Sequence, residues 1–252
     1  MNTVVLTSIK NTNVFPATSY QGLLLIGDPH LEARVPGFRC DDYPRVILEK
    51  LGWCLDYASR EALFPVILGD LFQLPRDNPN WLLGEVISLF DPPIVGIYGN
   101  HDVQKNQLDE NDSLDIVIKS GKLLLLDEDH VFRGLFNGRP VVLGGTSWGQ
   151  RIPASVPAEV DSSGTPATVI WITHHDVKVP GYEEQGYFPP REIPGIDLVV
   201  NGHIHRHLES VKKGQTLWTT PGNIARRSRS DASRDHIPSA FRVDVNREGW
   251  ET

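Results

Sequence analysis

Cysteine is scarce in this chain of 252 residues, which contains only Cys40 and Cys54. Two cysteines are too few for a disulfide framework, so small disulfide-rich secreted folds are excluded and a reducing, cytoplasmic location is predicted. Long apolar runs are also missing, because no stretch approaches the ~18 residues that a membrane span requires. The N-terminus lacks the basic and apolar segments of a signal peptide. We therefore expect a soluble protein with no membrane partner.

The chain has no excess of basic residues either, since 24 Lys and Arg face 32 Asp and Glu and the net charge is −8. Any contact with nucleic acid must then come from a local basic patch. What is present is an ordinary globular composition, 40% hydrophobic and 22% charged, which is enough to bury a large core. No internal repeat or low-complexity tract divides the chain. We expect one domain over residues 1–252.

Apolar runs alternate with amphipathic segments along the chain. Residues 22–26 read as a buried strand, residues 42–63 as an amphipathic helix capped by Asp41 or Asp42, and residues 65–68 as a second strand. This order indicates a parallel strand–helix–strand unit and an α/β fold. Further helices are expected at 80–90 and 111–118, further strands at 4–6, 94–98, 123–126, 141–145, 169–172, 196–200, 215–220 and 240–245, and long loops at 153–168 and 180–194.

Polar motifs follow five of the expected strands. They are Asp28 with His30, Asp70, Asn100 with His101 and Asp102, His174 with His175, and His203 with His205. Each motif alone is typical of a polar turn. In open α/β sheets, however, ligands bind beyond the carboxyl ends of the strands, so five such motifs predict one shared site. In an extended stretch alternate side chains point the same way, which would let both members of an Asp-x-His or His-x-His pair face one metal.

The residue types in these motifs indicate a metal centre. The candidate ligands are Asp28, His30, Asp70, Asn100, one histidine of the 174/175 pair, His203 and His205. Seven ligands are too many for one ion and suit two ions ~3.5–4 Å apart that share a carboxylate, with a hydroxide between them as nucleophile. Imidazole, carboxylate and amide ligands without cysteine suit Mn²⁺, Fe²⁺ or Zn²⁺, and we expect Mn²⁺.

The same series of motifs, from about residue 22 to residue 206, closely resembles the calcineurin-like metallophosphoesterases. The resemblance implies a four-layer α/β sandwich, with two mixed β-sheets packed face to face and flanked by helices. It also implies a metal-dependent phosphoric ester hydrolase.

Matched residue by residue, the resemblance assigns a role to each motif. Asp28, His30 and His205 would hold one metal, Asn100, His174 and His203 the other, and Asp70 would bridge them. His174 is preferred because the family's ligand usually follows the strand directly, and His175 stays as the alternative. His101 would protonate the leaving oxygen or steady the transition state, with Asp102 orienting its ring.

The substrate is predicted from two features that look like the SbcD-type DNA repair exonucleases. One is the segment 69–72 followed by Pro75, and the other is the segment 221–224 followed by a basic run. The arginines of that run, which could bind phosphates of DNA, are Arg226, Arg227, Arg229 and Arg234. Those nucleases carry a C-terminal capping domain, which we do not expect here, so the prediction is a stand-alone nuclease. No particular protein partner is indicated.

Two alternatives remain open at the level of sequence. The aromatic loop around Tyr182, Tyr187 and Phe188 could wall a pocket for a small substrate such as a cyclic nucleotide, or could simply pack on the sheet. Some proteins with this fold are scaffolds whose metal sites have decayed, but the ligands are intact at every motif here. The sequence therefore favours a phosphodiesterase that acts on DNA.

Overall fold

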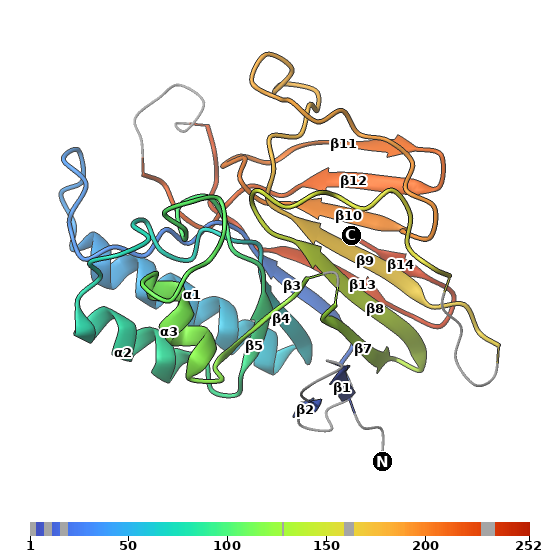
Figure 1. Ribbon diagram of the computed structural model, residues 1–252, viewed down its shortest axis with the longest axis horizontal. Helices are drawn as coiled ribbons and strands as arrows, with labels where there is room; N and C mark the ends of the chain where they lie inside the picture. The colour runs from blue at the N-terminus through green and yellow to red at the C-terminus, as the bar shows by residue number, and fades with distance from the viewer. Residues whose placement is uncertain (1–3, 8–11, 16–19, 128, 159–163, 228–234) are drawn as a thin grey trace.

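The computed structural model of the protein describes residues 4–7, 12–15, 20–127, 129–158, 164–227 and 235–252 (Figure 1). In these residues the strands form two mixed β-sheets, one of eight strands and one of six. We call them the larger sheet and the smaller sheet.

The smaller sheet has its parallel strands at one side. Its order is β14 (Trp250–Glu251), β13 (Phe241–Val245), β3 (Gly22–Ile26), β4 (Leu63–Ile67), β5 (Ile94–Gly96) and β6 (Leu123–Leu125). Strands β3 to β6 run parallel, whereas β13 and β14 are antiparallel additions. The carboxyl ends of β3, β4 and β5 therefore lie along one edge, as the motifs predict.

The larger sheet combines a parallel centre with antiparallel flanks. Its order is β11 (Leu208–Lys213), β12 (Thr216–Thr220), β10 (Leu198–Asn201), β9 (Thr168–Thr173), β8 (Arg139–Thr146), β7 (Val131–Phe136), β1 (Val4–Thr7) and β2 (Thr12–Phe15). Strands β8, β9, β10 and β12 are parallel to one another. The ends of β9 and β10, which carry histidine motifs, are therefore neighbours.

Helices cover the outer face of the smaller sheet. They are α1 (Tyr43–Arg60), α2 (Asn80–Leu89) and α3 (Ser113–Lys119). Helix α1 begins after Asp42 as predicted and buries Ile47, Leu51 and Ala58 along one stripe. It ends at Arg60, before the predicted residue 63, because Ala62 has a φ of 51° and Leu63 already starts β4.

The smaller sheet has a layer of the core on each side, because β3 is buried on both faces. Leu24 and Ile26 pack against the helices, whereas Leu23 and Leu25 point towards the larger sheet. A strand covered on both sides needs apolar residues at every position, which explains the unbroken run at 22–26. The predicted α/β fold with two mixed sheets packed face to face is confirmed.

The outer face of the larger sheet is not covered by helices in the described part of the chain, although the resemblance implies helices there. In the described part of the chain, loop residues such as Val177, Val179 and Ile193 pack on Trp171 and Trp218 of this sheet. The fourth layer of the sandwich is thus formed by loops here. None of the described helices is long and apolar enough to cross a membrane.

Candidate metal centre

The five predicted motifs converge where the carboxyl ends of β3, β4 and β5 meet those of β9 and β10. Asp28 and His30 follow β3, Asp70 follows β4, and Asn100 follows β5. The histidine motifs at 174 and 203 follow β9 and β10 of the other sheet. Residues far apart in the sequence therefore face one another where the carboxyl-end edges of the two sheets meet.

One group of side chains that could hold a metal ion consists of Asp28, His30, Asp70 and His205, whose ligand atoms all lie within 4.8 Å of one another. The Nε2 atoms of His30 and His205 are 2.8 Å apart. His30 Nε2 also lies 3.5 Å from Asp70 Oδ2. Asp28, His30 and Asp70 are buried, and His205 closes the group on the solvent side.

A second group consists of Asp70, His174 and His203. His174 Nε2 lies 3.3 Å from Asp70 Oδ2. The amide oxygen of Asn100 joins this group, at 2.9 Å from His203 Nδ1 and 3.3 Å from His174 Nε2. Asp70 belongs to both groups, which is the position that the sequence predicts for a bridging carboxylate.

The unpaired atoms of the cluster fit a divalent cation. Asp28 Oδ2 and Asp70 Oδ2 are buried and have no hydrogen-bond partner among the described residues. Buried carboxylate oxygens without partners are costly, and a cation in their midst would satisfy them. The donors are carboxylate oxygens, imidazole nitrogens and an amide oxygen, a set that suits borderline and hard divalent metals.

Burial and the close approach of like charges also change the pKa values of the side chains in this cluster. Burial raises the pKa of Asp28 to about 8, with the negative charge of Asp70 acting in the same direction. Burial opposes the charging of His174, but the carboxylates of Asp70 and Asp28 raise its pKa to about 9. The cluster therefore holds protons near neutral pH, and a bound metal would displace them.

The backbone that presents these ligands is not extended. The φ angles are 39° at Asp28, 47° at His30, 48° at Asp70 and 69° at His203. The prediction that an extended backbone aims alternate side chains at the metals is therefore wrong. Tight turns with left-handed residues aim them instead, and such strain is held where the surrounding structure fixes it. Asp28 and His30 belong to one group of ligands as predicted, whereas His203 and His205 belong to different groups.

Glycine is also required in the loop after β5, which carries Asn100. A Cβ built on Gly99 would overlap the Oδ1 atom of Asp70. Only the absence of a side chain lets the loop after β5 approach the shared carboxylate this closely.

The structure distinguishes the two neighbouring histidines. His174 Nδ1 is hydrogen bonded to the carbonyl of Leu68 at 2.7 Å, which leaves Nε2 directed at Asp70 and Asn100. Both ring nitrogens of His175 are engaged elsewhere, with the Thr173 hydroxyl and with the Gln150 carbonyl at 2.9 Å. The geometry favours His174 as the ligand over His175.

His101 lies beside the first group, but its ring is held differently from the prediction. Its backbone N–H donates to Asp70 Oδ1 at 2.8 Å, and its ring is 4.8 Å from that of His30. Its Nδ1 is 3.0 Å from the carbonyl oxygen of Gln73. The prediction that Asp102 orients this ring is therefore wrong, and the main chain at Gln73 has that role.

Asp102 instead clamps two loops together. Its carboxylate accepts hydrogen bonds from the backbone N–H groups of Gly99 and Phe72 at 2.9 Å and Leu71 at 3.2 Å. Burial, reinforced by the charge of Asp70, raises the pKa of Asp102 to about 7. Asp102 thus fixes the loops that carry Asp70 and Asn100.

The predicted substrate-binding arginines contact different parts of the protein. Arg227 forms an ion pair with Glu32 at 2.7 Å, and its charge adds to the effect of burial in lowering the pKa of His30. The side chain of Arg226 is hydrogen bonded to the carbonyl of His236. Arg229 and Arg234 lie outside the described residues. Of the two predicted arginines that the structure describes, Arg227 is the one whose charge acts on a residue of the first group.

Asp176 is a candidate functional residue that the sequence motifs do not predict. Its Oδ1 atom is 2.8 Å from Nε2 of His203, while Nδ1 of the same ring faces Asn100. A carboxylate on the far side of a ligand imidazole fixes the ring and raises its basicity. The sequence feature that could have indicated this role is a carboxylate directly after two histidines. Its partner, His203, lies 27 residues later in the chain.

Replacing Asp176 by asparagine should weaken metal binding at the second group by about 10–100-fold, because the ring of His203 loses its charged partner. Titration of the metal-free protein with Mn²⁺, followed by calorimetry, measures this change. Asp56 is an exposed carboxylate on α1, so Asp56→Asn is the control and should bind Mn²⁺ like the wild type. Wild-type affinity of Asp176→Asn would contradict the assigned role.

Comparison with known proteins places these observations in a family. The family model described as calcineurin-like phosphoesterase matches residues 23–207. A similar solved structure is the crystal structure of a hypothetical protein from Thermus thermophilus, with a TM-score of 0.51 and 13% sequence identity over 91% of this chain and 96% of that chain. At that identity the likeness shows the fold alone. No curated protein matches this chain.

Proposed function

This chain belongs to the calcineurin-like phosphoesterase family, and we propose that it is a phosphodiesterase that uses two divalent metal ions and acts on DNA. The observation that carries the proposal is the position of Asp70, which is common to both groups of metal-binding side chains. When bound, the two cations would acidify a water molecule and neutralise charge on the phosphoryl group. Mn²⁺ is the proposed metal, with Fe²⁺ and Zn²⁺ as alternatives.

The ligands divide between the two ions as the geometry groups them. Asp28, His30 and His205 would hold one ion, and Asn100, His174 and His203 the other. Asp70 would contribute to both. The Leu68 carbonyl and the Asp176 carboxylate hold the rings of His174 and His203 in the orientation that this requires.

His101 is the proposed acid for the leaving group. A carbonyl oxygen only accepts hydrogen bonds, so the contact with Gln73 means that Nδ1 of His101 carries a proton. In the charged ring the second proton sits on Nε2, the atom that would donate to the leaving oxygen. The backbone contact with Asp70 keeps this ring beside the metal cluster.

The preference for DNA rests on the segment that follows the last metal motif. It resembles the SbcD-type nucleases in its Pro221-Gly222-Asn223-Ile224 run and its basic continuation. Arg227 supports the proposal because it lies close enough to influence His30, although Glu32 neutralises part of its charge. A DNA phosphate next to the scissile bond would compete with Glu32 for this guanidinium.

A cyclic-nucleotide phosphodiesterase is the second candidate. It is favoured by Phe188, whose ring is 5.4 Å from that of His175, and by Tyr187, whose side chain is 78% exposed. Such rings could stack on a single base.

An assay with added Mn²⁺ separates these functions. We expect turnover of single-stranded DNA and of bis-p-nitrophenyl phosphate, and little turnover of cyclic nucleotides. Hydrolysis of cyclic nucleotides without hydrolysis of single-stranded or double-stranded DNA would overturn the nuclease proposal. Inactivity on every substrate together with the absence of bound transition metal would favour a scaffold instead.

A further inference from the structure

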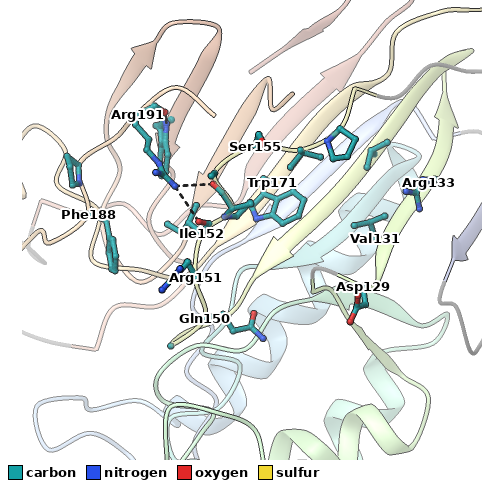
Figure 2. Close-up of a pocket in the computed structure, with 18 residues that line it drawn as sticks. Asp129, Val131, Arg133, Gln150, Arg151, Ile152, Ser155, Trp171, Phe188 and Arg191 are labelled. Carbon is teal, nitrogen blue, oxygen red and sulfur yellow. Dashed lines mark hydrogen bonds between the residues drawn. The ribbon is translucent and has the colours of Figure 1, made fainter. Parts of the chain in front are cut away.

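A pocket of about 1390 Å³ lies on the outer face of the larger sheet (Figure 2). Its charged lining residues in the described part of the chain are Arg133, Arg151, Arg191 and Asp129, so three positive charges and one negative charge give a local net charge of +2. The whole chain has a net charge of −8. We call this cavity the arginine pocket and define it by Arg133, Arg151, Arg191, Trp171, Trp218 and Phe188.

The floor of the arginine pocket is apolar and fixed. The indole N–H of Trp171 donates to Thr146 Oγ1 at 2.7 Å, and that of Trp218 donates to the Arg191 carbonyl at 2.8 Å. Their polar atoms are thus satisfied within the protein, so the surface that they offer to a ligand is their aromatic carbon. Trp171 lies between the two ends of the pocket in Figure 2.

The arginines frame this floor. Arg191 Nη2 donates to the carbonyls of Ile152 and Pro153 at 3.4 Å and 3.1 Å, so its guanidinium is anchored to the wall. Arg151 is exposed and has no ion-pair partner among the described residues. Figure 2 places Arg151 and Arg191 near Phe188 at one end and Arg133 at the other. Positive charges are therefore spread along the length of an apolar surface.

The arginine pocket adjoins the metal centre through two of its lining residues. The Gln150 carbonyl contacts His175 Nε2 at 2.9 Å, and the ring of Phe188 packs edge-on against the ring of His175. His175 directly follows His174, a proposed metal ligand. The loop is held there because the backbone N–H groups of Tyr187 and Phe188 donate to the Asp176 carbonyl at 2.7 Å and 2.9 Å. A substrate held at the metals could continue into the pocket past Phe188.

The chemistry of the pocket selects the class of substrate. Sites for small ligands usually have volumes of about 300–1,000 Å³. The volume of this cavity alone is above that range, and the metal centre would accommodate a further part of the substrate. Apolar and aromatic surface beside separated arginines suits a chain of bases joined by phosphates. Bases are free to stack only when they are unpaired, so a single strand fits and a duplex does not.

We propose that the arginine pocket binds unpaired nucleotides of a single-stranded nucleic acid whose scissile phosphate lies at the metal centre. This inference rests on the proposed phosphodiesterase function. It places the substrate path over the outer face of the larger sheet, and Arg227 would contact the substrate on the other side of the scissile bond.

Fluorescence anisotropy with a fluorescein-labelled twelve-nucleotide oligo(dT) tests the pocket. Mn²⁺ is kept in the buffer so that the metal centre is loaded, and phosphorothioate linkages in the oligonucleotide slow its hydrolysis during the measurement. Replacing Arg151 by glutamate should weaken binding by about 10-fold and reduce the slope of log K against log salt concentration by about one, because one phosphate contact is lost. Arg151 is exposed, so the variant should melt at the wild-type temperature.

Arg60→Glu is the matched control, because Arg60 is an exposed arginine at the end of α1, on the helix-covered side of the molecule. This substitution makes the same change in net charge as Arg151→Glu. The Arg60→Glu protein should bind the oligonucleotide within about twofold of the wild type, because salt screens the interaction between a distant surface charge and the bound strand. A twelve-base-pair duplex should bind the wild type at least about 10-fold more weakly than oligo(dT), because paired bases cannot stack on the aromatic side chains of the pocket.

Equal binding by the wild type and Arg151→Glu, or equal binding of duplex and single strand, would overturn the inference. An equal loss in Arg60→Glu and Arg151→Glu would also overturn it, because the effect would then be net charge alone. The proposed function is judged separately by hydrolysis of bis-p-nitrophenyl phosphate by the wild type with Mn²⁺. If the wild type hydrolyses bis-p-nitrophenyl phosphate but Arg151→Glu binds the oligonucleotide as the wild type does, the inference about the arginine pocket is overturned and the proposed function stands.

Discussion

Asp70→Ala is expected to abolish hydrolysis of every phosphodiester and to lower the bound metal from about two ions per chain to one or none. The reason is that Asp70 is the residue common to both metal groups, with Oδ2 at 3.5 Å from His30 Nε2 and 3.3 Å from His174 Nε2. Its Oδ1 also accepts the backbone N–H of His101. One substitution therefore removes a ligand from both ions and loosens the proposed acid.

Metal analysis after dialysis and a Mn²⁺-supplemented assay measure this result together. Asp56→Ala, which removes an exposed carboxylate from α1, is the control and should keep both metals and full activity. Circular dichroism shows whether Asp70→Ala is folded, because Asp70 is buried. A folded Asp70→Ala protein that retained two metals or wild-type turnover would rule out the shared-carboxylate arrangement.

His101→Ala should reduce turnover of DNA by about 10²–10⁴-fold, the usual contribution of a general acid, while both metals stay bound. The ring of His101 is not a member of either metal group, but it stands 4.8 Å from the ring of His30. Its loss should therefore affect proton transfer and leave the ligands in place. Steady-state kinetics on an oligonucleotide, with metal analysis of the same sample, measures both effects.

A comparison of leaving groups serves as the control for His101. The p-nitrophenolate of bis-p-nitrophenyl phosphate is a good leaving group and needs little protonation, so His101→Ala should slow its release far less than it slows DNA cleavage. Equal losses of turnover on both substrates would show that His101 acts on substrate binding or on transition-state charge. Loss of bound metal from His101→Ala would show that His101 supports the metal-binding side chains.

The buried centre of the fold could be predicted from the sequence because its strands are apolar at every position. The strand at 22–26 was predicted with the bounds that β3 has. Strand β11 was missed because it carries Glu209, Lys212 and Lys213 and is largely exposed at the edge of its sheet. An edge strand needs neither an apolar run nor strict alternation, and its lysines protect it from pairing with other chains.

The candidate ligands could be predicted because each lies within four residues of the end of a strand, where sequence position determines spatial position. The residues that orient them could not, since those contacts depend on how loops pack. The Gln73 carbonyl beside His101 is a main-chain atom that any residue would offer. The resemblance assigns Asp102 to the neighbouring ring of His101, whereas its carboxylate binds the backbone of Leu71 and Phe72.

The central claim, that Asp70 is shared by two metal ions, is tested most directly by anomalous scattering from crystals grown with Mn²⁺. We predict two peaks about 3.5–4 Å apart, one on each side of the Asp70 carboxylate. One peak should lie among Asp28, His30 and His205, and the other among Asn100, His174 and His203. A single peak, or two peaks of which one lies away from Asp70, would contradict the account.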